Sequence, residues 1–290
     1  MALLDFSGEE VLIWRRKLLE QGGRDSDLDW LLDIGGGLRW NKLQQIRLDP
    51  SRNFKLEQSL DYLASIWKEH LDNQIPLQHL LGRCPWRDFE LEVSSAALIP
   101  RQETELLVDL ALQRFENDFA GFWADLGTGS GALAVALARA FPDAAGHAVD
   151  SSNQALSLAS RNLKRLAPNA NVCMHLGSWW EPLKPWWGRI GLVLANPPYI
   201  PSAVLKQLDP IVRENEPHLA LCGGPDGLNA CREIVSGAAM AISPGGWLIL
   251  EHHHDQSDEL LEHMNKSGLV DVDFETDLDG TKRFALGRNH

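Results

Sequence analysis

The stretch FWADLGTGSGA, residues 122–132, decides the fold. An apolar strand runs into a glycine-rich loop, and an alanine-rich helix follows from Leu133 to Phe141. Glycines let the loop turn tightly and let its backbone approach a ligand at the start of the helix. This order of strand, loop and helix predicts an α/β unit with a binding site at the carboxyl end of the strand.

The next strand, residues 145–149, ends in Asp150, about twenty residues past the loop. A carboxylate at that place can accept hydrogen bonds from both hydroxyls of a ribose. Gly127, Gly129 and Ala132 also satisfy the dinucleotide pattern G-x-G-x-x-A. The two features together predict an adenosine-containing cofactor and leave its identity open.

Asp125 at the head of the loop narrows the choice of cofactor. A nicotinamide loop has to receive a pyrophosphate, which a carboxylate would repel. S-adenosyl-L-methionine has an ammonium group and no phosphate, so the same carboxylate would attract it. Asp125 therefore favours S-adenosyl-L-methionine.

A third strand, residues 172–176, is followed by Gly177, Ser178, Trp179 and Trp180. Core packing explains most of the eleven tryptophans. Only the position of Trp179, at a strand end beside the expected cofactor, favours an indole that covers the adenine ring.

The stretch LVLANPPYI, residues 192–200, marks a second strand end. Pro197 and Pro198 stop the strand at Asn196, because proline has no N–H to give a sheet. The Asn196 amide, a carbonyl without a strand partner and the Tyr199 ring would then project into one crevice. This set suits a planar group that carries an NH2. The alternative is an ordinary Asn-Pro turn.

Two segments are expected around this crevice. Arg101 stands directly before a helix that starts near residue 105, so it is a candidate lid over a bound ligand, with a solvated charge as the alternative. Residues 200–227 read as a long irregular loop. Such loops inside compact domains are usually functional, and we expect this one to wall the substrate pocket.

The composition excludes several classes of protein. The chain of 290 residues has 44% hydrophobic residues, 23% charged residues and a formal net charge of −13. This acidity argues against an extended phosphate-binding surface, so no direct contact with nucleic acid is expected. The four cysteines lack CxxC spacing and no signal peptide is evident, which predicts a cytoplasmic protein. No apolar run reaches the roughly 20 residues of a membrane helix.

Three regions are expected along the chain. Residues 1–75 show helical periodicity and predict a bundle of about four helices, either a scaffold or a grip for a protein partner. Residues 76–98 predict a linker with a β-hairpin, and residues 99–290 the catalytic domain. The run His252 to His254 invites a metal site, but neighbouring residues of an extended chain point in opposite directions, and we predict none.

With these residues collected, the chain resembles the PrmC or HemK family of glutamine methyltransferases that modify peptide chain release factors. The resemblance extends over nearly the whole length. It is carried by LIPRQETE, DLGTGSGA, AVDSS, GSWW, NPPYI, the EP…AL…GG.DGL stretch and DLDGTKRFALGR. Two residues depart from the family pattern: Gln102 replaces a usual proline, and His253 replaces a usual glycine.

The resemblance implies a Rossmann-like class I methyltransferase with a seven-stranded, mostly parallel sheet. We expect the chain to act as a monomer. It implies that S-adenosyl-L-methionine binds and leaves as S-adenosyl-L-homocysteine. The residues implied to hold it are Asp125, Gly127, Thr128, Gly129, Ser130, Gly131, Asp150, Trp179 and Asn196. The glutamine of the Gly-Gly-Gln motif in class I release factors would be held by Asn196, Pro197, Pro198 and Tyr199, with Arg101 at the rim.

The implied chemistry agrees with these residue types. An amide nitrogen is a poor nucleophile, and no strong base is visible, so the site would work by positioning. The Asn196 side-chain oxygen and the Pro197 carbonyl would each accept one N–H of the glutamine amide, while Tyr199 packs on its plane. Alignment of two bound reactants lowers a barrier by roughly 7–11 kcal/mol in the best model systems.

Other functions stay open at this point. A DNA adenine methyltransferase would need a target-recognition domain and a basic cleft, which this acidic chain lacks. A ribosomal-protein glutamine methyltransferase is the closer rival, and the run from Glu103 to Glu105 favours release factors. An inactive cofactor-binding module would not need Asn196.

Overall fold

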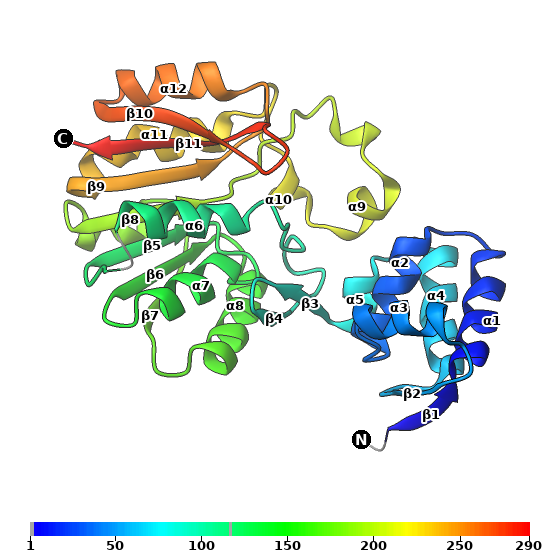
Figure 1. The fold of residues 1–290 in the computed structure, drawn as a ribbon. Coiled ribbons are helices and arrows are strands. Elements are labelled where there is room, and N and C mark those ends of the chain that lie inside the picture. Colours follow the sequence, from blue (N-terminus) through cyan, green and yellow to red (C-terminus); the bar gives the residue numbers. More distant parts are fainter. Residues whose placement is uncertain (1–2, 116–117) are drawn as a thin grey trace. The chain divides into compact units, whose positions relative to one another are not determined.

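The computed structural model describes residues 3–115 and 118–290. The chain divides into two compact units, Met1–Gly82 and Arg83–His290 (Figure 1). No helix in the described part is both long and apolar enough to cross a bilayer.

The first unit is mainly helical and has its own core. Its helices are α1 (Gly8–Leu19), α2 (Asp25–Trp30), the π-helix η1 (Leu31–Gly35), α3 (Trp40–Leu48), α4 (Leu60–Asn73) and α5 (Leu77–Leu81). Ser7 and Glu10 cap α1 reciprocally, which satisfies backbone N–H groups at the helix start. The short antiparallel strands β1 (Leu4–Ser7) and β2 (Asn53–Leu56) were not expected from the helical periodicity.

The second unit is built on a seven-stranded sheet in the order β10-β11-β9-β8-β5-β6-β7, which confirms the predicted fold class. Its strands are β5 (Phe122–Leu126), β6 (Ala145–Asp150), β7 (Asn171–Leu176), β8 (Ile190–Ala195), β9 (Ile242–Glu251), β10 (Leu269–Thr276) and β11 (Lys282–Asn289). Strands β5 to β9 are parallel, and β11 runs antiparallel to β9 and β10.

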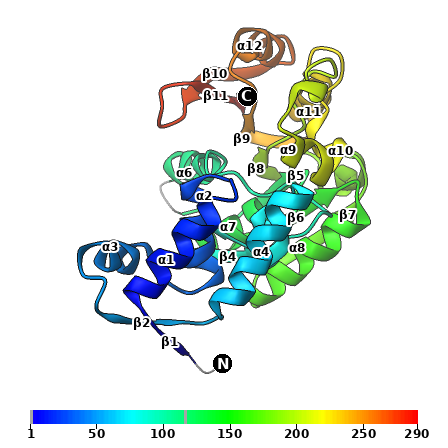
Figure 2. The same cartoon turned by 90° about the vertical axis from the view of Figure 1, so that its right-hand side faces the viewer.

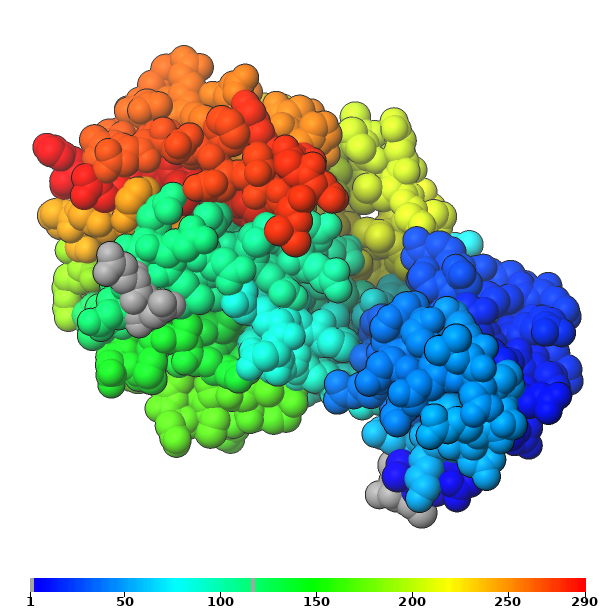
Figure 3. All heavy atoms as spheres, viewed as in Figure 1, coloured from blue at the N-terminus to red at the C-terminus, as the bar shows by residue number. Residues whose placement is uncertain are grey.

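Helices cover both faces of this sheet (Figures 1 and 2). They are α6 (Glu105–Arg114), α7 (Ala132–Ala140) and α8 (Asn153–Leu166), then α11 (Asn229–Ala241) and α12 (Ser257–Lys266). Leu192 and Leu194 pack in one core with α6 and α7, and Val193 and Ala195 in the other with α11 and α12. The apolar run of β8 is therefore buried on both faces, as expected of a central parallel strand. Figure 3 shows the atoms of α12, β10 and β11 (orange to red) side by side on the surface.

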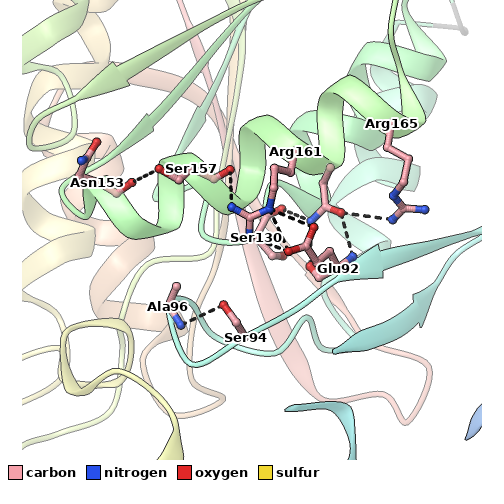
Figure 4. Close-up of polar contacts among 9 residues, drawn as sticks. Glu92, Ser94, Ala96, Ser130, Asn153, Ser157, Arg161 and Arg165 are labelled. Carbon is pink, nitrogen blue, oxygen red and sulfur yellow. Dashed lines mark hydrogen bonds and ion pairs between the residues drawn. The ribbon is translucent and has the colours of Figure 1, made fainter. Parts of the chain in front are cut away.

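The predicted hairpin is confirmed by antiparallel pairing of β3 (Arg83–Trp86) with β4 (Phe89–Glu92). It belongs to the second unit, where Arg161 of α8 pairs with Glu92 (Figure 4). Asn162, fully buried beside them, accepts the Glu92 N–H at 2.8 Å and donates to the Glu92 and Ser130 carbonyls at 2.8 and 2.9 Å. One amide thus ties the hairpin and the glycine loop to α8.

The segment after Tyr199 differs from the irregular loop that we expected. It contains the 3₁₀ helix η3 (Leu205–Gln207) and the short helices α9 (Pro210–Asn215) and α10 (His218–Leu221). Asp209 caps α9 and Pro210 stands in its first turn, a start signal that the sequence already contains.

Candidate active site

Strand register brings four strand ends to one edge of the sheet. Leu126 pairs with both Val149 and Ala195, and Ala195 pairs in turn with Leu250. The residues that follow these four positions are therefore neighbours across the sheet. A cavity of about 430 Å³ opens at this edge, within the second unit.

The glycine loop that follows β5 forms one end of the cavity. Gly127, Gly129 and Gly131 have φ angles of +80°, +54° and +84°, a region that favours glycine. The N–H groups of Gly127 and Thr128 both donate to the Val149 carbonyl at 2.9 Å. The loop is therefore fixed against β6 and presents backbone to the cavity.

We expected Asp125 to contact the cofactor directly. Instead it lies behind this loop and does not line the cavity. Its side chain is fully buried and accepts the Thr128 hydroxyl at 2.6 Å and the Ala134 N–H at 3.1 Å. Burial raises the pKa of this carboxyl to about 7, against the lowering effect of these two hydrogen bonds. Asp125 therefore joins the loop to the first turn of α7.

Asp150 lies on the cavity wall at the end of β6. Its carboxylate accepts the Gly129 N–H at 2.9 Å and the Ser152 N–H at 2.8 Å. Burial raises the pKa of Asp150, and these backbone hydrogen bonds oppose the shift. Each carboxylate oxygen keeps a lone pair for a further donor.

The two tryptophans after β7 differ in position: Trp179 lines the cavity and Trp180 is buried in the core. Trp179 is half-buried and lines the cavity, with its ring 3.2 Å from where a Cβ on Gly127 would lie. Trp180 is buried and donates from Nε1 to the Ile234 carbonyl at 2.8 Å. Trp180 is therefore a core residue, and of the two only Trp179 lines the cavity.

Asn196, directly after β8, forms the other end of the cavity. Its Nδ2 donates to Thr104 Oγ1 at 2.9 Å, and that hydroxyl donates to Glu251 Oε2 at 2.7 Å. The Tyr199 hydroxyl donates to Glu251 Oε1 at 3.2 Å. Burial first, and then the charge of Glu251, raise the pKa of Tyr199. Tyr199 is therefore a neutral ring with a fixed hydroxyl.

Arg101 lines the cavity and is held by an ion pair with Glu216 at 2.7 Å. The Glu216 side chain is 1% exposed and burial raises its pKa, while the Arg101 guanidinium lowers it. Pro217 and Leu219, just beyond, also line the cavity. The ion pair thus joins the segment before α6 to the segment between α9 and α10.

The structure brings most of the predicted site residues to one cavity. Its lining includes Arg101, Gly127, Thr128, Gly129, Ser130, Asp150, Trp179, Asn196 and Pro198. Four predicted residues are outside the lining: Asp125, Gly131, Pro197 and Tyr199. Gly131 faces α8, where an added Cβ would lie 3.0 Å from Ala159, so this glycine serves loop packing.

Our sequence reasoning missed three polar residues of the site: Thr104, Glu216 and Glu251. Glu251 is the last residue of a buried apolar strand, which is the signal that identified Asp150. Thr104 and Glu216 come from segments without strand periodicity, so no comparable signal pointed to them.

The fold and the strand-end cavity define a Rossmann-like methyltransferase. Residues 102–223 match the family model described as Methyltransferase small domain. Among solved structures, the hMettl16 catalytic domain in complex with MAT2A 3′UTR hairpin 6 aligns with a TM-score of 0.55 and 13% identity. The alignment covers 82% of this chain and 84% of that one, and at this identity it supports the fold alone.

Full-length relatives define the family. The chain is 59% identical over 283 residues to the release factor glutamine methyltransferase of Prochlorococcus marinus, covering 97% of each chain. It is 36% identical over 295 residues to that of Synechocystis sp., again covering 97% of each chain. The chain therefore belongs to the release factor glutamine methyltransferase family and is an enzyme of the methyltransferase class, as the sequence motifs predicted.

Proposed function

We propose that this enzyme transfers a methyl group from S-adenosyl-L-methionine to the side-chain amide nitrogen of glutamine in the Gly-Gly-Gln motif of class I release factors. The names of its full-length relatives support this substrate. The observation that carries the proposal is the orientation of the Asn196 amide. Its NH2 donates to Thr104, so its oxygen can accept a hydrogen bond from a substrate.

The cavity fits the cofactor. A Cβ on Gly129 would have no heavy atom nearer than 3.7 Å, so the loop backbone there is open to a ligand. Asp150 keeps lone pairs for ribose hydroxyls, and Trp179 supplies an indole for the adenine. When bound, S-adenosyl-L-methionine supplies an electrophilic methyl carbon. A neighbouring structure, the Thermus thermophilus 16S rRNA methyltransferase, is a complex with AdoMet and guanosine, which supports the choice of cofactor.

At the other end, Asn196 Oδ1 and the Pro197 carbonyl would accept the two N–H groups of the glutamine amide. Within the described chain, no hydrogen bond involves the Pro197 carbonyl. Arg101 and Pro198 would border the pocket, and Tyr199, outside the lining, would support it through its hydrogen bond to Glu251. Two acceptors hold the amide plane so that its out-of-plane density faces the methyl carbon, which lowers the barrier by alignment.

The other parts of the proposal concern the whole protein. Residues 1–75 would recognise the release factor and residues 99–290 would carry out the transfer. Residues 76–98 would connect them, with the boundary of the two units after Gly82 and the hairpin in the second unit. We propose a cytoplasmic monomer that modifies protein and not nucleic acid.

A three-arm assay tests this function. The enzyme is incubated with methyl-labelled S-adenosyl-L-methionine and either a purified class I release factor, a purified ribosomal-protein substrate or duplex DNA. Mass spectrometry then locates the label. We expect label on the glutamine of the Gly-Gly-Gln motif alone. Label on the ribosomal protein or on adenine, with none on the release factor, would reject the proposal.

A further inference from the structure

We propose that Glu251 is a positioning residue that fixes which way round the Asn196 amide faces, acting through the Thr104 hydroxyl. This inference rests on the proposed function, because it concerns the acceptor offered to the substrate amide. Glu251 does not line the cavity and would not touch the substrate.

Three segments meet in this arrangement. Glu251 is the last residue of β9, Asn196 follows the adjacent β8, and Thr104 directly precedes α6. Glu251 is 1% exposed and Thr104 is 5% exposed. The chain of contacts runs from Asn196 Nδ2 to Thr104 Oγ1 at 2.9 Å, and from that hydroxyl to Glu251 Oε2 at 2.7 Å.

The direction of these hydrogen bonds follows from the number of donors. An ionised carboxylate can only accept, so the single Thr104 hydroxyl hydrogen goes to Glu251. The hydroxyl can then only accept from Asn196, which selects Nδ2 for that contact. Oδ1 is left on the other side of the amide, where it can accept an N–H from a glutamine substrate.

The second carboxylate oxygen holds another residue of the same NPPY stretch. Tyr199 stands three residues beyond Asn196, and its hydroxyl donates to Glu251 Oε1 at 3.2 Å. A single buried carboxylate therefore fixes both the amide and the aromatic ring of the NPPY stretch.

The groups around Glu251 shift its pKa in opposite directions. Arg283 of β11 lowers its pKa, and Glu103, before α6, raises it. The Thr104 and Tyr199 hydroxyls also lower it, but burial is the largest effect and raises the pKa to about 7. Arg283 is itself paired with Asp277 at 2.8 Å. A protonated Glu251 would carry an O–H that can donate to the Thr104 hydroxyl. The hydroxyl could then donate to Asn196, so the direction of the hydrogen bonds would no longer fix which way the Asn196 amide faces.

Glu251→Gln tests the inference, because it keeps the shape and replaces one acceptor by an NH2 donor. The Gln NH2 can donate to Thr104, which frees the hydroxyl to donate to Asn196 and turns the Asn196 NH2 toward the substrate. We expect kcat for release-factor methylation to fall about 10²–10³-fold, as when one oriented hydrogen-bonding group is lost. The dissociation constant for S-adenosyl-L-methionine, measured by calorimetry, should change less than about threefold.

Two further variants separate orientation from a structural role. Thr104→Val removes the hydroxyl at nearly constant shape and should lose kcat to a similar extent. Thr104→Ser restores the hydroxyl and should recover most of that loss. Glu275→Gln, on β10 and paired with Arg114 outside the cavity, is the matched control and should retain wild-type kcat.

The pH profile gives a readout that a merely structural role would not move. Wild-type kcat should fall as the pH drops through about 7, because Glu251 becomes protonated. The residual activity of Glu251→Gln should lack this acid limb, while circular dichroism shows a native fold. Wild-type kcat in folded Glu251→Gln, with the wild-type enzyme methylating the release factor, would overturn the inference. Absence of methylation by the wild-type enzyme would instead reject the proposed function.

Discussion

The two ends of the cavity each rest on a buried carboxyl that does not reach the cavity itself. Asp125 lies behind the glycine loop and Glu251 behind Asn196, with exposed fractions of 0% and 1%. Each accepts a threonine hydroxyl, from Thr128 at 2.6 Å and from Thr104 at 2.7 Å. Burial raises the pKa of both carboxyls to about 7.

The two ends differ in what the carboxyl controls. Asp125 also accepts the Ala134 N–H, so it fixes the backbone of the loop, which lines the cavity. Glu251 controls a side-chain amide instead, through Thr104. A backbone site depends on φ angles and close packing, whereas a side-chain site depends on which atom is a donor. Although both ends rest on a buried carboxyl, we therefore expect substitutions at the two ends to have different effects.

The largest effect is expected at the side-chain end. Asn196→Ala removes one of the two proposed acceptors for the glutamine amide, and kcat should fall about 10²–10³-fold. Cofactor affinity should be partly retained, because the backbone end is intact. Methylation assays and calorimetry measure the two quantities. Unchanged turnover would exclude the proposed pocket.

At the backbone end, Gly131→Ala should act on stability. The residue has a φ of +84°, and a Cβ would lie 3.0 Å from Ala159 Cα. Strain and contact together should cost about 2–3 kcal/mol in free energy of unfolding. Gly188→Ala is the control, with a φ of +73° and no atom within 4 Å of the new Cβ. Equal losses in urea unfolding would show that the loop is not packed tightly against α8.

Asp150→Ala tests whether the cofactor is also held by a side chain at the backbone end. The change removes the acceptor of the Gly129 N–H and the proposed partner of the ribose. Cofactor affinity should fall about 10- to 100-fold, the range of one or two hydrogen bonds to a charged group. The exposed Asp143→Ala should leave it unchanged. Equal affinities by calorimetry would reject the ribose assignment.

Asp125→Asn should change the pH dependence of stability. The folded-state pKa of about 7 is above the ordinary value of 3.8, so the folded state binds more protons between these values. The contribution of Asp125 is full below about pH 4 and is lost as the pH rises through 7. Asparagine does not titrate, so the loss of stability between pH 5 and 8 should shrink by roughly 2 kcal/mol. Identical pH profiles of unfolding would contradict a buried, titrating Asp125.

Much of the second unit could be predicted because its signals are local. Apolar runs, the glycine loop and the proline stop at Pro197 each indicate one element, and parallel strands place their ends together. The position of Asp125 could not be predicted, since strand alternation alone does not show whether a side chain faces a cavity or the packing beneath it.

The remaining differences come from contacts between distant segments. Thr104 and Glu251 are 147 positions apart, and Arg101 and Glu216 are 115 apart. Nothing in the sequence periodicity joins such pairs. The π-helix η1 and the β1–β2 pair in the first unit likewise depend on packing that helical spacing does not describe.

A structure of the enzyme with S-adenosyl-L-homocysteine and a glutamine peptide from a release factor tests the central claim most directly. The account predicts the glutamine amide nitrogen within about 2.7–3.2 Å of both Asn196 Oδ1 and the Pro197 carbonyl, facing the cofactor sulfur. A glutamine bound elsewhere, or with Asn196 turned so that its NH2 faces the substrate, would contradict it.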